Sequence, residues 1–298
     1  MFVKAIEKAS GFLRPVHVVY RYYNENKVNK SALNIIFVNE NGVAITARHV
    51  AEHMEELAGA HEKYLGFLKE KAKLRGTTKA ADLKKLETKY GYKGKDTFPV
   101  VQASLKLYDC FTEPFPRYKV IHHSQHDLSV LIFENYGKRL YKSCAKFIRD
   151  ATQLKPGLSV CKLGYINPQF TNYNYDEEKD EIEWTGYTDR APVFYPVEGI
   201  ITRNLILGYY TYALETSTPG LRGQSGGPLL DRKGNVCGIN TATDSLEFQY
   251  DFKMPDEKII KETVTINYQP KFLVGHSLHA DIIKLFLKAN GIKFHTAD

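Results

Sequence analysis

Gly223-Gln224-Ser225-Gly226-Gly227-Pro228 is the stretch that decides how the rest of the chain is interpreted. A serine between glycines can sit on a turn that another molecule approaches closely, because glycine adopts backbone conformations closed to other residues. Two backbone N–H groups of such a turn, those of Gly223 and Ser225, can point the same way and hold an oxyanion. The stretch therefore indicates a nucleophilic serine with its oxyanion hole beside it.

This segment resembles the nucleophile loop of the trypsin/chymotrypsin family of serine peptidases, which usually reads Gly-Asp-Ser-Gly-Gly-Pro. The resemblance implies a histidine and then an aspartate earlier in the chain. Residues 43–49 end in Thr-Ala-Arg-His, which is similar to the family's Thr-Ala-Ala-His element, and residues 126–131 resemble its Asp-x-x-x-Leu strand. The order His49, Asp127, Ser225 is the order found in chymotrypsin.

The chemistry that this resemblance implies is peptide-bond cleavage by a serine endopeptidase through an acyl-enzyme. A serine hydroxyl is a weak nucleophile at neutral pH and needs a base within hydrogen-bond reach. His49 would take the proton of Ser225, Asp127 would hold the imidazole in the right tautomer, and the N–H groups of Gly223 and Ser225 would stabilise the oxyanion. We expect a protein or peptide substrate, no cofactor and no metal.

The implied fold is mainly β, with two six-stranded antiparallel β-barrels, a helical insertion in the first barrel and a C-terminal helix. We expect an N-terminal helix over 1–15, a first barrel over 16–140, and a second barrel with the C-terminal helix over 141–298. Apolar alternation bounded by turn signals predicts strands. They fall at 16–23, 33–38, 43–46, 98–108, 119–122, 158–164, 193–207, 209–215 and 236–241, with a polar hairpin at 172–186 and a helix at 280–289. Residues 238–242 also resemble the high-temperature-requirement branch of the family.

Two helical segments lie outside this common pattern. The N-terminal pattern Phe2, Ile6, Ala9, Leu13 predicts a helix that Pro15 ends and that packs on the outside of the first barrel. Residues 52–95 are the insertion. Its predicted apolar stripe is Met54, Ala58, His61, Leu65, Leu68 and Ala72, followed by a second helix marked by Leu83, Leu86 and Tyr90. The insertion is interpreted either as a helical hairpin lying on the barrel or as a docking arm or lid that selects partners or substrates, with a regulatory protein as its expected contact.

Composition limits the remaining function classes. At 298 residues and 43% hydrophobic content the chain can bury a sizeable core. The N-terminus lacks the apolar stretch of a secretory signal, no 18-residue apolar run occurs, and the four scattered cysteines are expected to be reduced. These features predict a cytoplasmic protein without a membrane segment. The net charge of +7 comes largely from one Lys-rich segment and favours a solvated face over nucleic-acid binding.

Residues around the serine carry the expectations for activation and specificity. Gln224 replaces the aspartate that pairs with a newly cut N-terminus in secreted relatives, so the full-length chain is expected to need no such cut. By resemblance, Thr241 hydrogen-bonds Asp127, and residues 241–243 pair with the substrate backbone. The candidate pocket residues are Pro219, Arg222, Thr241, Ala242 and Thr243. With Pro219 at the floor and Thr243 on a wall, a small or medium apolar side chain is expected, although Asp244 lies near enough to change this preference.

Three alternatives remain open from the sequence. His49-x-x-Glu52-His53 matches a zinc-peptidase pattern, to which His122, His123 and His126 could add ligands. Gly223-x-Ser225-x-Gly227 also fits the nucleophile elbow of α/β-hydrolases, with Asp256 and His279 downstream. That elbow must open directly into a helix, whereas Pro228 and Asp231-Arg232-Lys233-Gly234 predict a strand and hairpin. The third alternative is a catalytically silent protein-binding module of the same fold.

Overall fold

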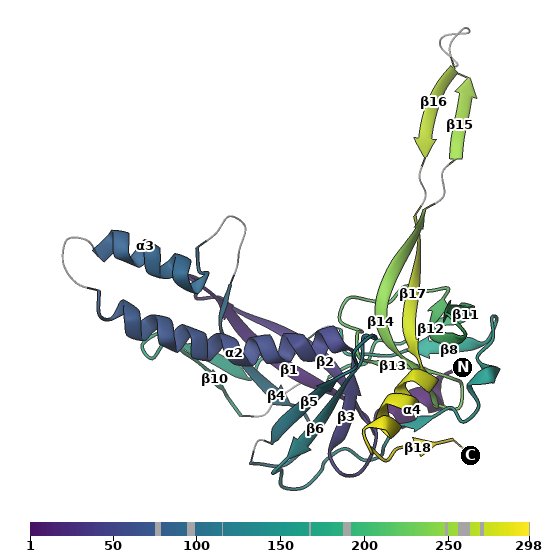
Figure 1. Cartoon of the computed structure of the whole chain (residues 1–298), viewed down its shortest axis with the longest axis horizontal. Helices are drawn as coiled ribbons and strands as arrows, with labels where there is room; N and C mark the ends of the chain where they lie inside the picture. The colour runs from purple at the N-terminus through teal and green to yellow at the C-terminus, as the bar shows by residue number, and fades with distance from the viewer. Residues whose placement is uncertain are drawn as a thin grey trace.

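The structure is a computed structural model that describes residues 1–74, 79–93, 99–114, 116–166, 168–186, 192–247, 250–255, 263–268 and 271–297. Two curled β-sheets lie side by side, a pair of helices extends from the first, and a two-stranded ribbon rises from the second (Figure 1). The expected mainly β, two-barrel architecture is the one that the structure has.

The first barrel is a six-stranded antiparallel sheet with the order β4-β1-β2-β3-β6-β5. Its strands are β1 (Leu13–Tyr22), β2 (Val28–Phe37), β3 (Val43–Thr46), β4 (Val100–Leu107), β5 (Arg117–His122) and β6 (Ser129–Glu134). The predicted hairpin turn joins β2 to β3, with Gly42 at a φ of 71° and Ile36 opposite Ile45. This register brings the end of β3, where the chain reaches His49, alongside the buried half of β2.

The second barrel is closed, because β13 pairs with both β8 and β14. Its strands are β7 (Lys146–Phe147), β8 (Ser159–Lys162), β11 (Val197–Leu207), β12 (Tyr210–Thr216), β13 (Pro228–Leu230), β14 (Val236–Glu247), β17 (Lys271–His279) and β18 (His295–Thr296). The order is β13-β8-β11-β12-β17-β14-β7-β18, and the short strands β7 and β18 pair in parallel. A 3₁₀ turn (Ala151–Gln153) precedes β8, and α4 (Ala280–Ala289) is the predicted C-terminal helix.

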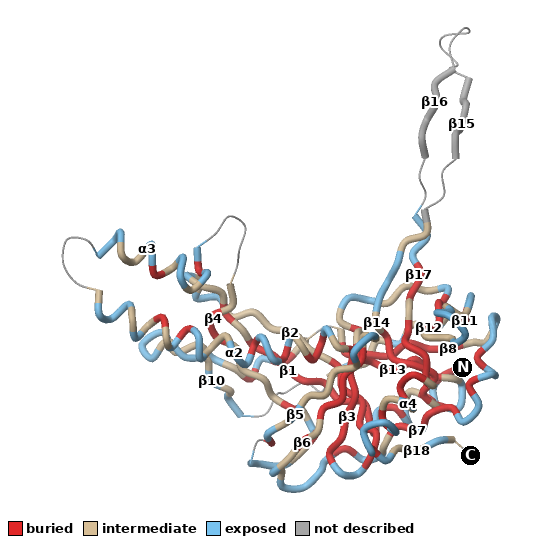
Figure 2. Tube along the Cα trace, in the orientation of Figure 1, coloured by how far each residue is buried: buried red, intermediate tan, exposed pale blue. Residues whose placement is uncertain are grey.

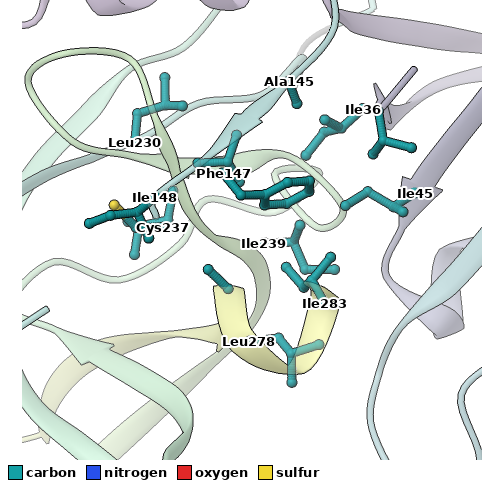
Figure 3. Close-up of a cluster of buried hydrophobic side chains, with 14 of the residues drawn as sticks. Ile36, Ile45, Ala145, Phe147, Ile148, Leu230, Cys237, Ile239, Leu278 and Ile283 are labelled. Carbon is teal, nitrogen blue, oxygen red and sulfur yellow. The ribbon is translucent and has the colours of Figure 1, made fainter. Parts of the chain in front are cut away.

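The largest buried cluster lies where the two barrels meet. Figure 3 shows Ile36 and Ile45 of the first barrel. They face side chains of the second barrel and of α4, among them Phe147, Ile239, Leu278 and Ile283. In Figure 2 the buried residues concentrate at this junction, whereas the helical arm is mostly exposed or half-buried. Apolar burial at the junction fixes the barrels relative to each other and thereby fixes the cleft between them.

The N-terminal helix α1 (Val3–Ala9) packs on the second barrel, so its expected position on the first barrel is wrong. Phe2 and Ala5 form a buried cluster with Cys161 of β8, and Lys8 Nζ donates to the carbonyl of Lys233 at 2.9 Å. The helix also ends well before Pro15, which lies within β1. The first strand begins at Leu13, earlier than expected, because Leu13 is already part of the core between the barrels.

The helical insertion consists of α2 (Arg48–Lys71) and α3 (Lys79–Tyr90), and its predicted apolar stripe is confirmed only in part. Met54 is buried and Leu68 is half-buried, but Ala58 and Leu65 are exposed. The rest of the buried face of α2 carries Leu57, Tyr64 and Phe67. Aromatic packing is the reason for the rotated face. Tyr64 and Phe67 join a cluster with Leu86, Tyr92 and Val101, on which Tyr23, the residue after β1, also packs.

A hairpin of the second barrel holds this insertion against the first. The strands β9 (Tyr173–Asp176) and β10 (Glu181–Trp184) form the predicted hairpin at 172–186, and Asp180 at its tip has a φ of 53°. The Asp180 carboxylate accepts from Arg21 Nη2 at 2.5 Å, from Tyr175 at 2.6 Å and from Tyr64 at 2.9 Å. Because Arg21 is buried, this charged group is paired and hydrogen-bonded as burial requires.

The sequence did not predict the long ribbon that β14 and β17 form, in which Gly238 lies opposite His279 and Glu247 opposite Lys271. Beyond it, β15 (Tyr250–Pro255) pairs with β16 (Thr263–Tyr268). All four cysteines are free thiols. Among the helices that the structure describes, none combines the length and the apolar character needed to cross a bilayer.

Candidate active site

His49 and Asp127 form a two-point contact at the start of α2. Asp127 Oδ2 lies 2.8 Å from His49 Nδ1, and Asp127 Oδ1 accepts the backbone N–H of His49 at 3.0 Å. His49 is the second residue of α2, so its N–H has no partner within the helix, and a carboxylate is favoured at this position. The contact therefore orients the ring and caps the helix at the same time.

A tight loop between β5 and β6 presents Asp127. The N–H of His123 donates to the carbonyl of Leu128 at 2.9 Å, which closes the loop. His123 Nδ1 accepts the N–H groups of Gln125 and His126, both at 3.1 Å. The side chain of His123 thus holds the backbone of the loop, and the Asp127 carboxylate remains directed at α2.

The electrostatics of the pair favour an ionised carboxylate beside a basic imidazole. The hydrogen bond with Asp127 raises the pKa of His49 above its usual value, while partial burial opposes this rise. Burial acts to raise the pKa of Asp127 as well, but the hydrogen bonds from the His49 ring and backbone outweigh it, and the net pKa is lowered. Asp127 thus stays charged while His49 gains and loses a proton.

The serine loop fits against the first barrel without room for larger residues. Gly226 has a φ of 79°, and a Cβ there would lie 2.2 Å from Thr46 Oγ1 and 2.6 Å from the carbonyl oxygen of Asn34. A Cβ on Gly227 would lie 2.1 Å from the carbonyl oxygen of Leu163. The glycines around the serine are therefore needed for the second barrel to seat this loop beside the end of β3, three residues before His49.

Asn34 is a positioning residue that the sequence reasoning missed. Its side chain is fully buried in β2, and Nδ2 donates to the carbonyl oxygens of Gly223 at 2.6 Å and of Ser225 at 3.2 Å. Its Oδ1 accepts the N–H of Tyr165 at 2.7 Å. The only hint in the sequence was a polar side chain inside the apolar run Leu33-Asn34-Ile35-Ile36, where a buried amide needs partners.

The side chain of Gln224 holds the backbone before the serine through neutral hydrogen bonds. It is buried, its Nε2 donates to the carbonyl of Tyr195 at 2.8 Å, and its Oε1 accepts the N–H of Leu221 at 2.9 Å. Within the described part of the chain, neither the N–H of Gly223 nor that of Ser225 has an acceptor. With Gly223 at a φ of 95°, these two donors remain available to a ligand.

One cavity of about 560 Å³ is lined by both His49 and Ser225. Between these two described side chains there is no hydrogen bond, as is common in a site without substrate. The wall opposite the serine loop is the first part of α2. Successive turns of this helix bring Glu52, His53 and Glu56 into the same cavity as His49.

A second cavity of about 330 Å³ is also lined by Ser225, and most of the candidate pocket residues lie in its walls. Arg222, Thr241, Ala242 and Thr243 line it, whereas Pro219 is not among its lining residues. The Thr243 hydroxyl lies 3.0 Å from the nitrogen and 3.1 Å from the oxygen of Gly220 and so ties the two walls together. The Thr241 hydroxyl donates to the carbonyl of His276 at 3.3 Å, and its expected partner Asp127 is instead bonded to His49.

Lys162 holds the backbone at Thr218, two residues before Gly220 of this second cavity. Its side chain is almost completely buried, and Nζ donates to the hydroxyl of Thr216 and to the carbonyl of Thr218. Burial lowers the pKa of this ammonium group to about 8. The contacts fix the backbone just before residue 219, and no sequence signal marked this lysine.

The side-chain contacts do not assemble the zinc or hydrolase alternatives. Glu52 is paired with Arg48 at 2.7 Å, and in the described residues the group that could hold a metal does not include His49 or His53. After Ser225 the chain enters strand β13 and not a helix, which contradicts the nucleophile elbow. Of the residues named for that elbow, His279 caps α4 through Nδ1, and Asp256 lies outside the described residues.

Comparison with known proteins agrees with this architecture. The family model for the trypsin-like peptidase domain matches residues 36–239, which include parts of both barrels and all three of His49, Asp127 and Ser225. The chain belongs to the trypsin-like peptidase family and is a serine peptidase, a hydrolase.

A search of solved structures finds a similar chain described as "HtrA-type protease AlgW with decapeptide", with 16% sequence identity and a TM-score of 0.47. The similarity covers 97% of this chain and 67% of that chain. A search of curated protein sequences finds no match.

Replacing Asn34 by aspartate should loosen the serine loop. Asn34→Asp keeps the shape of the side chain but replaces the donor to two carbonyl oxygens with a carboxylate. At about 1–3 kcal/mol for each lost hydrogen bond, kcat/KM should fall by about 100-fold or more, with a similar far-UV circular dichroism spectrum. The matched control is Asn29→Asp on the same strand, whose Nδ2 has no partner among the described residues. Equal activity of the two variants would show that Asn34 does not position the loop.

Proposed function

We propose that the chain is an endopeptidase in which Ser225, His49 and Asp127 act as a catalytic triad. One observation carries the proposal. The Asp127 carboxylate bonds both Nδ1 and the backbone N–H of His49, and His49 lines the same cavity as Ser225. This contact leaves His49 Nε2 as the ring nitrogen that can take the serine proton.

The proposed reaction has two stages. Ser225 Oγ attacks the scissile carbonyl carbon as its proton moves to His49 Nε2, and the N–H groups of Gly223 and Ser225 stabilise the oxyanion. His49 then gives that proton to the leaving amine, which produces an acyl-enzyme. Water attacks the acyl carbon in the same way and restores the serine. Each oxyanion donor contributes on the order of 3 kcal/mol.

The substrate proposed for this site is an extended peptide added to the free edge of β14. The strand β13 pairs with β14 only as far as Ile239, so residues 241–243 keep one edge open next to Ser225. Backbone hydrogen bonds along this edge would supply affinity, and the neighbouring cavity would supply selectivity. Since Thr243 and Gly220 bridge that cavity, a small or medium apolar side chain fits the pocket best.

A regulatory protein that contacts the helical insertion, residues 52–95, is part of the proposal. Support comes from the position of His49 on α2, because a partner that moved this helix would move the base. Photo-crosslinking from exposed Leu65 in cells should capture such a partner. Capture of substrates alone would contradict it.

We also propose a cytoplasmic location, supported by the four free thiols. Alkylation of a cell extract should then modify all four cysteines after unfolding, whereas protection of any pair would point to an oxidising compartment.

Covalent labelling tests the nucleophile. A fluorophosphonate should label the full-length chain at Ser225, and Ser225→Ala should lose both the label and peptidase activity, with kcat lowered by about 10⁶-fold. Unchanged thermal unfolding of the variant serves as the control for folding. A protein that is folded, unlabelled and inactive in its native form would instead fit the silent protein-binding module.

The pH dependence of the rate tests the histidine. Because His49 must be neutral to act as a base and its pKa is raised, kcat/KM should fall as the pH drops through a value above that of a free imidazole. Asp127→Asn removes the cause of the rise, so the acid limb should move to lower pH while kcat falls by about 10⁴-fold. An acid limb that is identical in the wild type and this variant would argue against the pair.

Peptide substrates that vary only at the residue before the cleaved bond test the pocket. Thr243→Gly removes the bridge to Gly220, so cleavage after Phe or Leu should increase relative to cleavage after Ala. The matched control is Thr211→Gly, which lies on β12 outside both cavities. The same preference in the wild type and Thr243→Gly would show that residue 243 does not limit the pocket.

A further inference from the structure

Three side chains that can ligate a metal converge outside the two cavities that Ser225 lines. Glu40 lies in the β2–β3 turn, Cys144 in the link between the barrels, and His295 on β18 near the end of the chain. One donor atom from each lies within 4.8 Å of the other two. We propose that Glu40, Cys144 and His295 form a structural binding site for a zinc ion, Zn²⁺.

The donor set fits zinc better than the other common divalent ions. Sulfur, imidazole nitrogen and carboxylate oxygen are the ligands of tetrahedral zinc sites, whereas magnesium and calcium take oxygen ligands. The carboxylate of Glu40 and a thiolate of Cys144 would together balance the two positive charges of the ion. Three protein ligands leave the fourth position of a tetrahedral site to water.

The distances need only a small adjustment. Bonds of about 2.0–2.3 Å to a tetrahedral zinc ion place the donor atoms about 3.3–3.8 Å apart. His295 Nε2 already lies 3.1 Å from Oε1 and 3.2 Å from Oε2 of Glu40, although the two residues are 255 positions apart in the sequence. Because all three donors lie within 4.8 Å, side-chain rotation suffices to bring the Cys144 sulfur into range.

The backbone around the three donors is held in place without a metal. Buried Asn39, next to Glu40, accepts the N–H of Asn41 through Oδ1 and donates through Nδ2 to the carbonyl of Lys293, both at 2.9 Å. His295 lies opposite Lys146 in the parallel pairing of β18 with β7. Ligands placed in advance lower the conformational cost of binding an ion.

Two effects oppose binding and set its conditions. Burial and the neighbouring carboxylate of Glu40 raise the pKa of Cys144 to about 12, so this group is a thiol that must release a proton when the ion binds. The positive charge of Arg139 acts on the same thiol and opposes a cation. A dipositive ion in direct contact with the sulfur favours the thiolate over the thiol, as it does for other zinc-bound cysteines.

A bound ion would connect three parts of the fold. The C-terminal segment after α4, the link between the barrels and the first hairpin of the first barrel would share one set of bonds. Binding only to the folded chain stabilises it by mass action. The C-terminal segment would then be resistant to fraying and proteolysis when the site is loaded.

Cobalt spectroscopy of the full-length, reduced chain tests the site. Co²⁺ should bind in a one-to-one ratio and produce a sulfur-to-cobalt charge-transfer band together with the strong visible bands of tetrahedral coordination. Zn²⁺ should displace it, and at 100-fold excess over Kd it should raise Tm by about 5 °C. Cys144→Ser should abolish the charge-transfer band, and His295→Ala should weaken binding by at least 10-fold.

The matched control is His122→Ala. It breaks another exposed His–Glu pair, in which Nε2 lies 3.0 Å from Glu55 Oε2 but which belongs to no metal-binding group among the described residues. This variant should keep the cobalt spectrum and the zinc-dependent Tm shift. The proposal is overturned if the wild type shows no charge-transfer band, if the band survives in Cys144→Ser, or if His295→Ala binds Zn²⁺ as tightly as the wild type. Because His295 is partly exposed, the last variant keeps the test valid even if Cys144→Ser folds poorly.

Discussion

The close contact between the serine loop and the first barrel is the constraint on which the rest of this structure depends. Gly226 leaves no space for a methyl group between itself, Thr46 and Asn34. Thr46 in turn donates to the carbonyl of Asn34 at 2.7 Å, so the two strands that receive the loop are themselves joined. The serine loop of the second barrel therefore takes its position from the first barrel, and the apolar core between the barrels keeps that position.

The site separates its tasks between rigid and exposed groups. Buried amides, those of Asn34 and Gln224, hold the backbone of the serine loop through neutral hydrogen bonds that do not depend on pH. The titrating groups, His49 and Asp127, remain partly open to solvent at the cleft. The imidazole can therefore change its charge without breaking the hydrogen bonds by which Asn34 and Gln224 hold the serine loop.

The helical insertion is connected to both halves of the site. On one side, His49 is the second residue of α2. On the other, the hairpin β9–β10 joins α2 through Asp180 and Tyr64, and it belongs to the segment that also contains Tyr165 and Tyr195. These two tyrosines contact Asn34 and Gln224 through their backbone groups. The contacts of the insertion therefore reach both His49 and the segment whose backbone bonds to Asn34 and Gln224.

The sequence alone determined the family, the order of His49, Asp127 and Ser225, the two-barrel fold, and the positions of most strands and of α4. These follow from local rules, because glycine-rich turns, apolar alternation and helix ends are set by neighbours in the chain. The face of α2 that is buried, the barrel that α1 covers, the roles of Asn34 and Lys162, and the meeting of Glu40, Cys144 and His295 were decided by the tertiary structure. Each depends on partners far away in the sequence, and whether a side chain is buried, bonded or free is a property of those partners and not of its own local pattern.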